Sequence, residues 1–367
     1  MNKMDFIENI VIGAGALGIA TAKKFQENDK PCLLIEKKEI IFNETSSRNS
    51  EVIHSGIYYK QGSYKNEFCL SGKELLYKYL QKNNIEHKKC GKLIVSNGSN
   101  SQNKKIVDLQ KLAKKKCIKH KTLTEAEISK KYSFLKSNVN LFIEDTGIFD
   151  SHSFGLSLLR DFENNGGLIS YKTEIDIFRK YKNCYLIGFK DTDYRILCKN
   201  IVLCSGLDSI KILKKSDVNS YVPEQALCKG DYFFYSGKIK SNSLIYPVPN
   251  DLGLGIHLTC GLDGRIKFGP DTYFINSIDY QVTNDKKANF LKAINEYIPQ
   301  IKEYELHPDY SGIRPKIKVN GQLYNDFYPF FEGNESAKIC SILSYESPGL
   351  TSCLAAANFL YQKVYGG

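Results

Sequence analysis

Residues 10–18 read IVIGAGALG, an apolar run that leads directly into a glycine-rich turn. Gly13, Gly15 and Gly18 have the G-x-G-x-x-G spacing, and a helix-like stretch follows them through Phe25. The first glycine of this motif permits a tight turn, the second lets a pyrophosphate approach the backbone, and the third lets the helix pack on the strand. The start of the helix then offers free N–H groups and the positive end of its dipole to phosphates.

A second strand-like run, Pro31–Glu36, ends in a carboxylate. In a dinucleotide-binding unit, an acid at the end of the second strand accepts hydrogen bonds from a ribose and disfavours a 2′-phosphate. Incidental glycines in an ordinary strand–turn–helix are the alternative interpretation, because glycine spacing alone is a weak signal. Strand, turn, helix, strand and acid occur here in the required order, so the sequence predicts a dinucleotide-binding protein.

The composition limits the partners. The chain has 367 residues, enough to bury a large core and to form two domains. Its 51 basic and 40 acidic residues give a formal net charge of +11, which favours an anionic substrate, an anionic membrane surface or nucleic acid. Most lysines are scattered, however, and the sequence contains no zinc-finger or other nucleic-acid motif, so no nucleic-acid partner is expected.

The cysteines and the N-terminus bear on the compartment. Eleven cysteines occur, and none forms a C-x-x-C pair. Their odd number and wide spacing argue against a disulfide framework or a metal site and favour a reducing environment. Asp5 and Glu8 interrupt the positive region that a signal peptide needs, and no apolar run reaches membrane-spanning length. We therefore expect a cytoplasmic protein that holds no metal.

Thr45–Tyr59, which reads TSSRNSEVIHSGIYY, is the second informative stretch. It combines hydroxyl side chains, Arg48, an amide, His54 and two tyrosines in one short segment. Small polar side chains and glycine suit a segment that lies against a ligand. A polar helix cap followed by a strand, with His54 satisfied by a carbonyl, explains the same composition, and the residues alone do not separate the two interpretations.

The rest of the chain alternates between helical and strand-like patterns. Helices are predicted over 63–83, 104–121, 152–164, 284–297 and 351–363, and Asp150 or Ser151 can cap the third of them. Strands are predicted over 89–96, 172–178, 184–190, 194–198, 200–207, 227–235, 244–246, 253–259, 265–268, 310–317 and 337–343. The strands within 172–198 are expected to form a β-meander, and those from 227 to 268 a second, antiparallel sheet.

Residues 104–121 form a strongly basic segment, with eight lysines and a single acid, Asp108. Apolar residues such as Ile106 and Ala113 share one side of the predicted helix. A solvated lysine face is favoured over a face that docks on a membrane or on a partner.

Several blocks of this sequence match one protein family. The glycine motif occurs in many folds, whereas the Asn49–Tyr59 block and the Gly312–Lys316 block are much more specific. Further matching segments are Cys90–Leu93, Asp145–His152, Lys229–Tyr232, Ile245–Pro249, Gly255–Thr259, Gly269–Asp271 and Glu346–Ser352. Over nearly its whole length the chain resembles the flavoproteins of the D-amino-acid-oxidase-like superfamily, and within it the L-2-hydroxyglutarate dehydrogenase group.

The resemblance implies FAD as the cofactor, bound non-covalently. It implies that the pyrophosphate lies on Gly13, Gly15, Ala16, Leu17 and Gly18, and the adenosine ribose on Glu36 with the adjacent Lys37. It also implies that Ser46, Ser47, Arg48 and Asn49 line the flavin or its phosphates, that Ile175 lies near the adenine, and that Ser205 and Gly206 pass close to the dinucleotide. Gly349, Leu350, Thr351 and Ser352 are then expected to direct N–H groups at the N1/O2 edge of the flavin, where negative charge develops on reduction.

The chemistry of a 2-hydroxy acid assigns further residues. Such a substrate passes a hydride from C2 to flavin N5, so its hydroxyl proton needs a base and its carboxylate needs a cation. Arg314 matches the substrate-carboxylate position of the family, and a guanidinium holds a carboxylate with two parallel hydrogen bonds. His54 is the first choice for the base and His257 the second, because the unperturbed pKa of histidine is about 6.5. Tyr59 and Lys229 are candidates for contact with the distal end of the substrate.

We therefore expect an FAD-dependent dehydrogenase or oxidase that converts a small 2-hydroxy acid, such as L-2-hydroxyglutarate, to the 2-oxo acid. One alternative is oxidation of an amino acid or a secondary amine on the same fold. The other is a flavin-binding protein without redox turnover, which docks through residues 104–121. The sequence leaves open whether a quinone, a carrier protein or oxygen accepts the electrons, and whether the basic segment brings the protein to the inner face of a membrane.

The expected fold class is α/β, with a doubly wound, Rossmann-like FAD-binding domain interleaved with an antiparallel-sheet (α+β) substrate domain. Residues 1–86, 145–215 and 308–367 are assigned to the first domain, and residues 87–144 and 216–307 to the second. The flavin is expected at their interface, with its phosphates at the carboxyl ends of the parallel strands.

Overall fold

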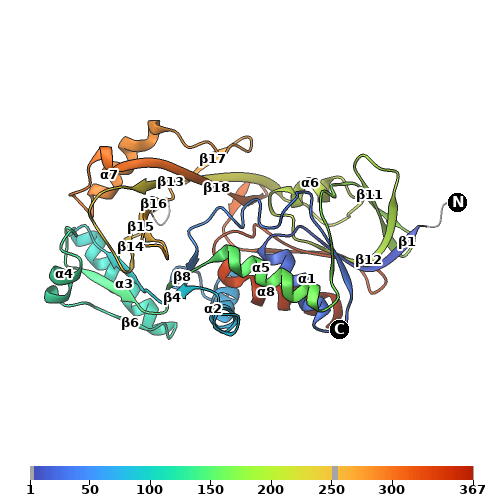
Figure 1. Ribbon diagram of the computed structural model, residues 1–367, viewed down its shortest axis with the longest axis horizontal. Coiled ribbons are helices and arrows are strands. Elements are labelled where there is room, and N and C mark those ends of the chain that lie inside the picture. The colour runs from blue at the N-terminus through green and yellow to red at the C-terminus, as the bar shows by residue number, and fades with distance from the viewer. Residues whose placement is uncertain (1–3, 250–254, 367) are drawn as a thin grey trace.

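The computed structural model describes residues 4–249 and 255–366. Within these ranges the strands form two large sheets and one small sheet, and helices cover the faces of both large sheets (Figure 1). The first large sheet has eight strands: β1 (Asp5–Ile12), β2 (Cys32–Ile35), β9 (Leu168–Ser170), β10 (Ile175–Tyr181), β11 (Cys184–Phe189), β12 (Arg195–Leu203), β20 (Tyr328–Gly333) and β21 (Lys338–Leu343).

The centre of this sheet is parallel. β1 pairs in parallel with β2 on one side and with β12 on the other, β2 pairs with β9, and β12 pairs with β21. Ile10 and Val11 point to opposite faces of β1, and both are fully buried. A parallel strand that is covered on both faces needs a continuous apolar run. The IVI sequence is therefore what a central strand of a doubly wound sheet requires. The predicted α/β fold is confirmed.

Four helices pack together beside the first sheet. They are α1 (Ala16–Gln26), α2 (Tyr64–Lys82), α5 (Ser151–Asn164) and α8 (Gly349–Tyr365). α1 contacts both α5 and α8, and α8 contacts α2 (Figure 1). The Asp150 side chain accepts a hydrogen bond from the backbone N–H of Ser153, so Asp150 is the cap of α5. The start of the chain, its middle and its end therefore share one core.

The β-meander predicted within residues 172–198 is confirmed, because β10, β11 and β12 pair in antiparallel fashion in sequence order. The prediction of separate strands over 194–198 and 200–207 is wrong, since β12 runs unbroken from Arg195 to Leu203. The polar Asn200 is accommodated within this strand, because its side chain is buried and donates a hydrogen bond to Asn9 Oδ1 on the neighbouring strand, at 2.9 Å. A satisfied amide thus lies inside the sheet.

The second large sheet has ten strands in the order β19-β18-β13-β16-β15-β14-β5-β7-β6, with β17 paired to β13. Its strands are β5 (Lys92–Val95), β6 (His120–Lys121), β7 (Asn140–Ile143), β13 (Glu224–Tyr235), β14 (Leu244–Pro247), β15 (His257–Cys260), β16 (Ile266–Gly269), β17 (Tyr273–Ile275), β18 (Leu306–Val319) and β19 (Gln322–Tyr324). Among the described residues, all its strand pairs are antiparallel except β14 with β5, so the second sheet has the predicted character. Of the strand predicted over 253–259, residues 253 and 254 lie outside the described ranges, and β15 begins at His257.

A small sheet of β3 (Val52–Ile53), β8 (Gly147–Phe149) and β4 (His87–Lys88) has the order β3-β8-β4. The remaining helices are α3 (Asn100–Lys115), α4 (Glu125–Lys131), α6 (Ser209–Lys214) and α7 (Lys287–Asn295), together with short 3₁₀ turns at Gly206–Asp208, Asn284–Lys286 and Glu303–Glu305.

The basic helix differs from its predicted limits of 104–121. α3 begins at Asn100, because the Ser99 side chain caps it by accepting a hydrogen bond from the Gln102 N–H. It ends at Lys115, just before Cys117, whose backbone φ of +53° is incompatible with a continuing helix. Ile106 and Ala113 are buried against the second sheet, while most lysines of the helix are exposed, as the solvated-face interpretation requires.

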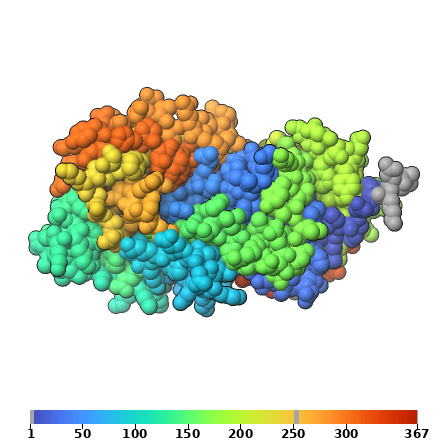
Figure 2. All heavy atoms as spheres, viewed as in Figure 1, coloured from blue at the N-terminus to red at the C-terminus, as the bar shows by residue number. Residues whose placement is uncertain are grey.

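The two large sheets occupy opposite ends of the molecule. α3, α4 and α7 lie at one end, and β1, β11 and β12 lie at the other (Figure 1). Figure 2 shows the segments near residue 110 and near residue 290 together at the first end. β18 pairs with β13 along most of its length, so residues 306–319 belong to the ten-stranded sheet. The division into domains at 86, 144, 215 and 307 stays a prediction.

Candidate active site

Two adjoining pockets form one groove between the large sheets. They share the residues Gly15, Thr45, Ser46, Cys204 and Gly206. The first pocket lies where β1, β2 and β12 end, which is where doubly wound sheets bind their ligands. The second pocket continues from it towards the ten-stranded sheet and the start of α8.

The glycine-rich turn forms one wall of the first pocket. Gly13 has a φ of +101°, and a Cβ atom there would lie 2.7 Å from the carbonyl oxygen of Cys204. A Cβ atom on Gly18 would lie 1.8 Å from the carbonyl oxygen of Gly13. The turn and the contact of helix with strand therefore both need glycine. The chain at Gly15 and Ser205 lines the pocket with backbone rather than bulky side chains.

Glu36 is held by the backbone at the end of β2. Its Oε2 accepts a hydrogen bond from the N–H of Ala14, and its Oε1 accepts one from the N–H of Lys38, both at 2.8 Å. Its side chain still lines the first pocket. Two backbone donors thus fix a carboxylate directly beside the glycine turn.

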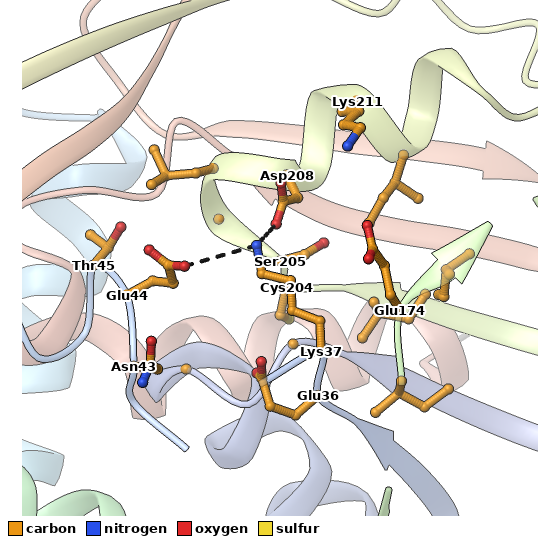
Figure 3. Close-up of a pocket in the computed structure, with 18 of the residues that line it drawn as sticks. Glu36, Lys37, Asn43, Glu44, Thr45, Glu174, Cys204, Ser205, Asp208 and Lys211 are labelled. Carbon is orange, nitrogen blue, oxygen red and sulfur yellow. Dashed lines mark hydrogen bonds and ion pairs between the residues drawn. The ribbon is translucent and has the colours of Figure 1, made fainter. Parts of the chain in front are cut away.

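Figure 3 shows how the other side chains of the first pocket lie. Lys37 forms an ion pair with Asp208 and approaches Glu44 Oε1 at 3.9 Å. Ile175, Ser205 and Gly206 line the pocket at the places that the sequence analysis predicted. The sequence analysis did not identify Glu44 or Asp208, which gave no motif signal because each acts only through its contact with Lys37.

The Thr45–Tyr59 segment forms a wall of the second pocket. Ser46 Oγ accepts a hydrogen bond from the N–H of Ala16 at 3.0 Å, which ties the segment to the glycine turn. The guanidinium of Arg48 stacks on Tyr280, with 4.0 Å between Cζ and the ring centroid. Asn49 also lines the pocket. Ser47 is exposed and lines neither pocket, so the structure does not bring it to the groove.

The start of α8 faces the second pocket. Gly349, Leu350 and Thr351 line it, and the helix has no side-chain hydrogen bond from its cap residue Pro348. Such an end presents backbone N–H groups and a positive partial charge to the groove. Ser352, in contrast, is fully buried and donates its hydroxyl hydrogen bond to the carbonyl of Gly349 at 3.2 Å, away from the groove.

A buried carboxylate with three cations lies beside these elements. Glu346 Oε1 is 2.7 Å from both Lys65 Nζ and Lys316 Nζ, and its Oε2 is 3.5 Å from Arg314 Nη1. Burial alone would raise the pKa of Glu346, but the charges of Lys65, Arg314 and Lys316 hold that pKa well below its usual range. One carboxylate does not neutralise three cations, so this cluster carries an excess of positive charge. Arg314, the most loosely held of the three, lines the groove.

His54 and His257 both line the second pocket. His54 Nε2 is 3.2 Å from Ser347 Oγ, and its backbone N–H donates to Thr351 Oγ1 at 3.1 Å. Burial, with the positive charges of Lys92, His257 and Arg314, lowers the pKa of His54 to about 3. Both rings are therefore neutral at neutral pH.

His257 differs from His54 in its free nitrogen. Its Nδ1 lies 3.1 Å from the carbonyl oxygen of Gly255, which can only accept, so Nδ1 carries the proton. Its buried Nε2 then presents a lone pair that has no hydrogen-bond partner among the described residues. The ring stacks on Tyr246 with 3.8 Å between centroids. Burial lowers the pKa of His257 to about 3, and Lys92 and Arg314 act in the same direction.

The two residues predicted for the distal end of the substrate have different positions. Tyr59 is close enough to Ser347, Glu346 and Arg314 for each of them to affect its pKa, which burial raises well above the usual value. Neither Tyr59 nor Lys229 lines the groove, and Lys229 points away from it. Its neighbour Cys228 pairs with Arg314, so Lys229 points to the opposite face of β13, where Asp279 Oδ2 binds its Nζ at 3.0 Å. The structure therefore corrects the expectation for Lys229.

Sequence reasoning missed several residues of the second pocket. Tyr232 and Tyr246 line it, and Lys65 and Lys316 hold Glu346 beside Arg314. Glu346 lies within the Glu346–Ser352 block that supports the family resemblance, which was the available signal. The lysines gave none, because buried and exposed lysines look alike in a sequence that contains so many of them.

A glycine turn at the carboxyl ends of parallel strands is typical of a dinucleotide-binding fold, and the adjoining pocket holds an arginine and two neutral histidines. Residues 9–362 match the family described as FAD dependent oxidoreductase, and the chain belongs to that family. The protein is thus an FAD-dependent oxidoreductase, and FAD is its cofactor.

Curated relatives cover nearly the whole chain. It is 34% identical to the mitochondrial L-2-hydroxyglutarate dehydrogenase of Arabidopsis thaliana, over 97% of this chain and 83% of that protein. It is 28% identical to the human mitochondrial enzyme of the same name, over 97% of this chain and 88% of that protein. The L-2-hydroxyglutarate dehydrogenase of Escherichia coli K12 is 24% identical, over 97% and 92% of the two chains.

Solved structures agree with the fold. L-α-glycerophosphate oxidase from Mycoplasma pneumoniae, solved with FAD bound, superposes with a TM-score of 0.87 at 22% identity, over 98% of this chain and 95% of that chain. Glycine oxidase from Geobacillus kaustophilus superposes with a TM-score of 0.81 at 13% identity, with the same coverage of 98% and 95%. Among the described residues, no helix is long and apolar enough to cross a membrane.

Proposed function

We propose that this enzyme oxidises L-2-hydroxyglutarate, or a close 2-hydroxy-acid analogue, to the 2-oxo acid. The observation that carries the proposal is the position of Arg314 in the same groove as His54 and His257. The substrate carboxylate needs the cation of Arg314, and the hydroxyl proton needs one of the two histidines as its base. The curated relatives named as L-2-hydroxyglutarate dehydrogenases support the choice of substrate.

The groove fits FAD on its own geometry. The positive φ of Gly13 and the close approach of its Cα to Cys204 leave room for a pyrophosphate but not for a side chain. We assign the pyrophosphate to the Gly13–Gly18 turn, the adenosine ribose to Glu36, and the adenine surroundings to Ile175. Ser205 and Gly206 then border the dinucleotide.

The flavin end is assigned to the second pocket, with Ser46, Arg48 and Asn49 along one side. FAD held there would supply the redox chemistry, as acceptor of a hydride. The uncapped start of α8, at Gly349–Thr351, directs N–H groups and a positive partial charge into the groove. These groups stabilise negative charge that develops in that pocket.

Arg314 is proposed to bind the substrate carboxylate. Its guanidinium holds only a 3.5 Å contact with Glu346, so it retains donors for a second carboxylate. Two parallel hydrogen bonds from the guanidinium hold the carbon next to the carboxylate in place. This lowers the entropic cost of reaching a reactive geometry. The excess positive charge of the Lys65–Arg314–Lys316 cluster attracts the anion into the groove.

We propose His257 as the base and His54 as a positioning residue beside it, the reverse of the order expected from the sequence. The lone pair on His257 Nε2 has no described partner, whereas His54 Nε2 already has Ser347 Oγ at 3.2 Å. The low pKa of His257, about 3, keeps that lone pair free at neutral pH. An anionic substrate offsets the charges of Lys92 and Arg314, and so raises the affinity of His257 for the hydroxyl proton.

The proposal includes the interleaved division into two domains. It also covers the electron acceptor and the location of the protein in the cell. A quinone, a carrier protein and oxygen are all compatible with the groove. The exposed lysines of α3 support contact with an anionic membrane surface, although the apolar side of that helix is packed on the protein. The plant and human relatives are named as mitochondrial, whereas the reduced cysteines of this chain support a cytoplasmic location.

The decisive experiment is anaerobic reduction of the purified protein, followed by its visible spectrum. L-2-hydroxyglutarate is expected to bleach the flavin bands within seconds. Bleaching by glycine, proline or sarcosine but not by the hydroxy acid moves the enzyme to amine oxidation. Bound flavin that no substrate reduces supports the non-catalytic alternative.

A further inference from the structure

Lys92 is a buried lysine without a counter-ion. It lies on β5 with 1% of its surface exposed. The other buried lysines have acids: Lys65 is 2.7 Å from Glu346, Lys73 is 3.3 Å from Asp145, and Lys229 is 3.0 Å from Asp279. Throughout residues 4–249 and 255–366, no carboxylate lies within 4.0 Å of Lys92 Nζ, and none of the recorded hydrogen bonds uses it. Burial of an unpaired ammonium is unfavourable, so its retention needs a reason.

Aromatic rings take the place of a counter-ion around Lys92. Its Nζ lies 4.3 Å from the ring centroid of Tyr58 and 4.8 Å from that of Tyr246. Such rings stabilise a cation, but less than a carboxylate does. Burial accordingly lowers the pKa of Lys92 to about 7. The protein thus leaves the Lys92 amine unpaired, and a bound anion beside it would favour its charged form.

Lys92 lies beside the groove, next to Tyr246, and does not itself line either pocket. In the parallel pairing of β5 with β14 it is the partner of Leu244, so it projects from the same face of the sheet as Tyr246. Tyr246 lines the second pocket and stacks on His257. The charge of Lys92 also lowers the pKa of both His54 and His257.

Two unpaired hydroxyl groups lie on the same side. Tyr58 Oη and Thr259 Oγ1 are buried and have no hydrogen-bond partner among the described residues. Ile245 pairs with Leu258, so Thr259 is opposite Leu244, whose other neighbour is Lys92. An ammonium with two hydroxyl donors is the set of groups that recognises a carboxylate.

We propose that Lys92 binds the second carboxylate of a dicarboxylic 2-hydroxy acid, and that Tyr58 and Thr259 support it. Arg314 then binds the carboxylate next to the reacting carbon, on β18 at the other side of the same sheet. The assignment deepens the proposed function and rests on it. It also replaces Lys229, whose charge is paired on the opposite face.

The test compares two substrates that differ only in the distal group. L-2-hydroxyglutarate carries the second carboxylate, and L-2-hydroxypentanoate has a methyl group there. In the Lys92→Met holoenzyme we expect kcat/KM for the diacid to fall about 50-fold, mostly through KM, because a charge-assisted hydrogen bond is lost. For the monoacid it is expected to change less than about 3-fold, since that substrate never made the contact.

Lys229→Met is the matched variant, because it also removes a buried lysine from this sheet. We expect it to leave the ratio of the two kcat/KM values unchanged. Binding of glutarate and of pentanoate, followed by perturbation of the flavin spectrum, gives a readout without turnover, and only glutarate binding is expected to weaken in Lys92→Met.

The outcomes separate the two proposals. If neither acid reduces the wild-type holoenzyme, the proposed function is overturned. Two other results apply when L-2-hydroxyglutarate does reduce the wild-type enzyme: Lys92→Met lowers kcat/KM equally for both substrates, or it leaves glutarate binding intact. Either result overturns the assignment of Lys92 and leaves the proposed function standing. If the ratio of the two kcat/KM values changes only in Lys229→Met, the role belongs to Lys229 and the assignment of Lys92 is likewise overturned.

Discussion

The two pockets of the groove are built in different ways. In the first, about half of the lining comes from residues 12–46, which contain the strand–turn–helix–strand unit and the hydrogen bond from the Ala14 N–H to Glu36, and the rest comes from residues 173–175, 204–215 and Ile278. The second collects side chains that are far apart in the sequence, such as His54, His257 and Arg314. The glycine turn and Glu36 of the first pocket are therefore specified by local conformation, whereas the second pocket exists only after two sheets have packed together.

This difference predicts that substitutions in one pocket leave the function of the other intact. The second pocket gives the largest effect. His257→Asn is expected to lower the rate of flavin reduction about 10³-fold, because a general base is lost. FAD content, read from the visible spectrum of the purified variant, should stay at the wild-type level. His54→Asn is the comparison, and a larger loss in that variant would make His54 the base.

Arg314→Ala tests the same separation through binding. We expect kcat/KM for the hydroxy acid to fall about 10²-fold, because a charge-assisted pair of hydrogen bonds to the carboxylate is removed. Arg314→Lys should recover part of the loss, since it keeps the charge but not the two parallel donors. Lys318→Ala, on an exposed position of the same strand, serves as the control. Wild-type kinetics in Arg314→Ala would contradict the assignment.

Glu36→Gln tests the first pocket. The affinity for FAD is expected to fall about 10-fold, because the amide loses the charge in the hydrogen bonds to Ala14, Lys38 and the ribose. Titration of the apoprotein with FAD by flavin fluorescence measures it. At saturating FAD, the KM for substrate should not change, and a raised KM would show that the pockets are not independent. Glu39→Gln, which removes an exposed acid, is the control.

The smallest expected effect concerns stability below neutral pH. The pKa of His257 falls from its ordinary 6.5 to about 3 on folding, so the unfolded chain binds a proton that the folded chain does not as pH drops below 6.5. This costs about 1 kcal/mol at pH 5.5, and the depressed pKa of Glu346 adds a loss in the same direction below about pH 4.5.

Thermal unfolding of the FAD-saturated enzyme measures this effect. Tm should decline between pH 7.5 and 5.5, and the decline should be shallower in His257→Asn. An equal decline in both proteins would mean that His257 gains its proton without unfolding.

Some residues of the site could be predicted from the sequence, and others could not. The IVIGAGALG motif and Glu36 predicted the first pocket, because spacing along one short segment fixes their geometry. Arg314, His54 and His257 were found only through their resemblance to family blocks. Lys229 was expected at the substrate end, but strand alternation turned it to the other face, and Lys92 lies instead on the face that carries Tyr246. A one-residue difference in strand register decides such a placement, and composition does not reveal it.

The sequence by itself determined the α/β class and the parallel nucleotide-binding unit, because each depends on a local pattern of apolar runs and glycines, whereas FAD followed from the resemblance of longer blocks to one family. Only the tertiary structure decided which cations share Glu346, which histidine keeps a free nitrogen, and which buried lysine lacks an acid. Those properties depend on burial and on pairing between distant strands. A lysine or a histidine acquires its chemistry from the groups that surround it after folding, and these are not its neighbours in the chain.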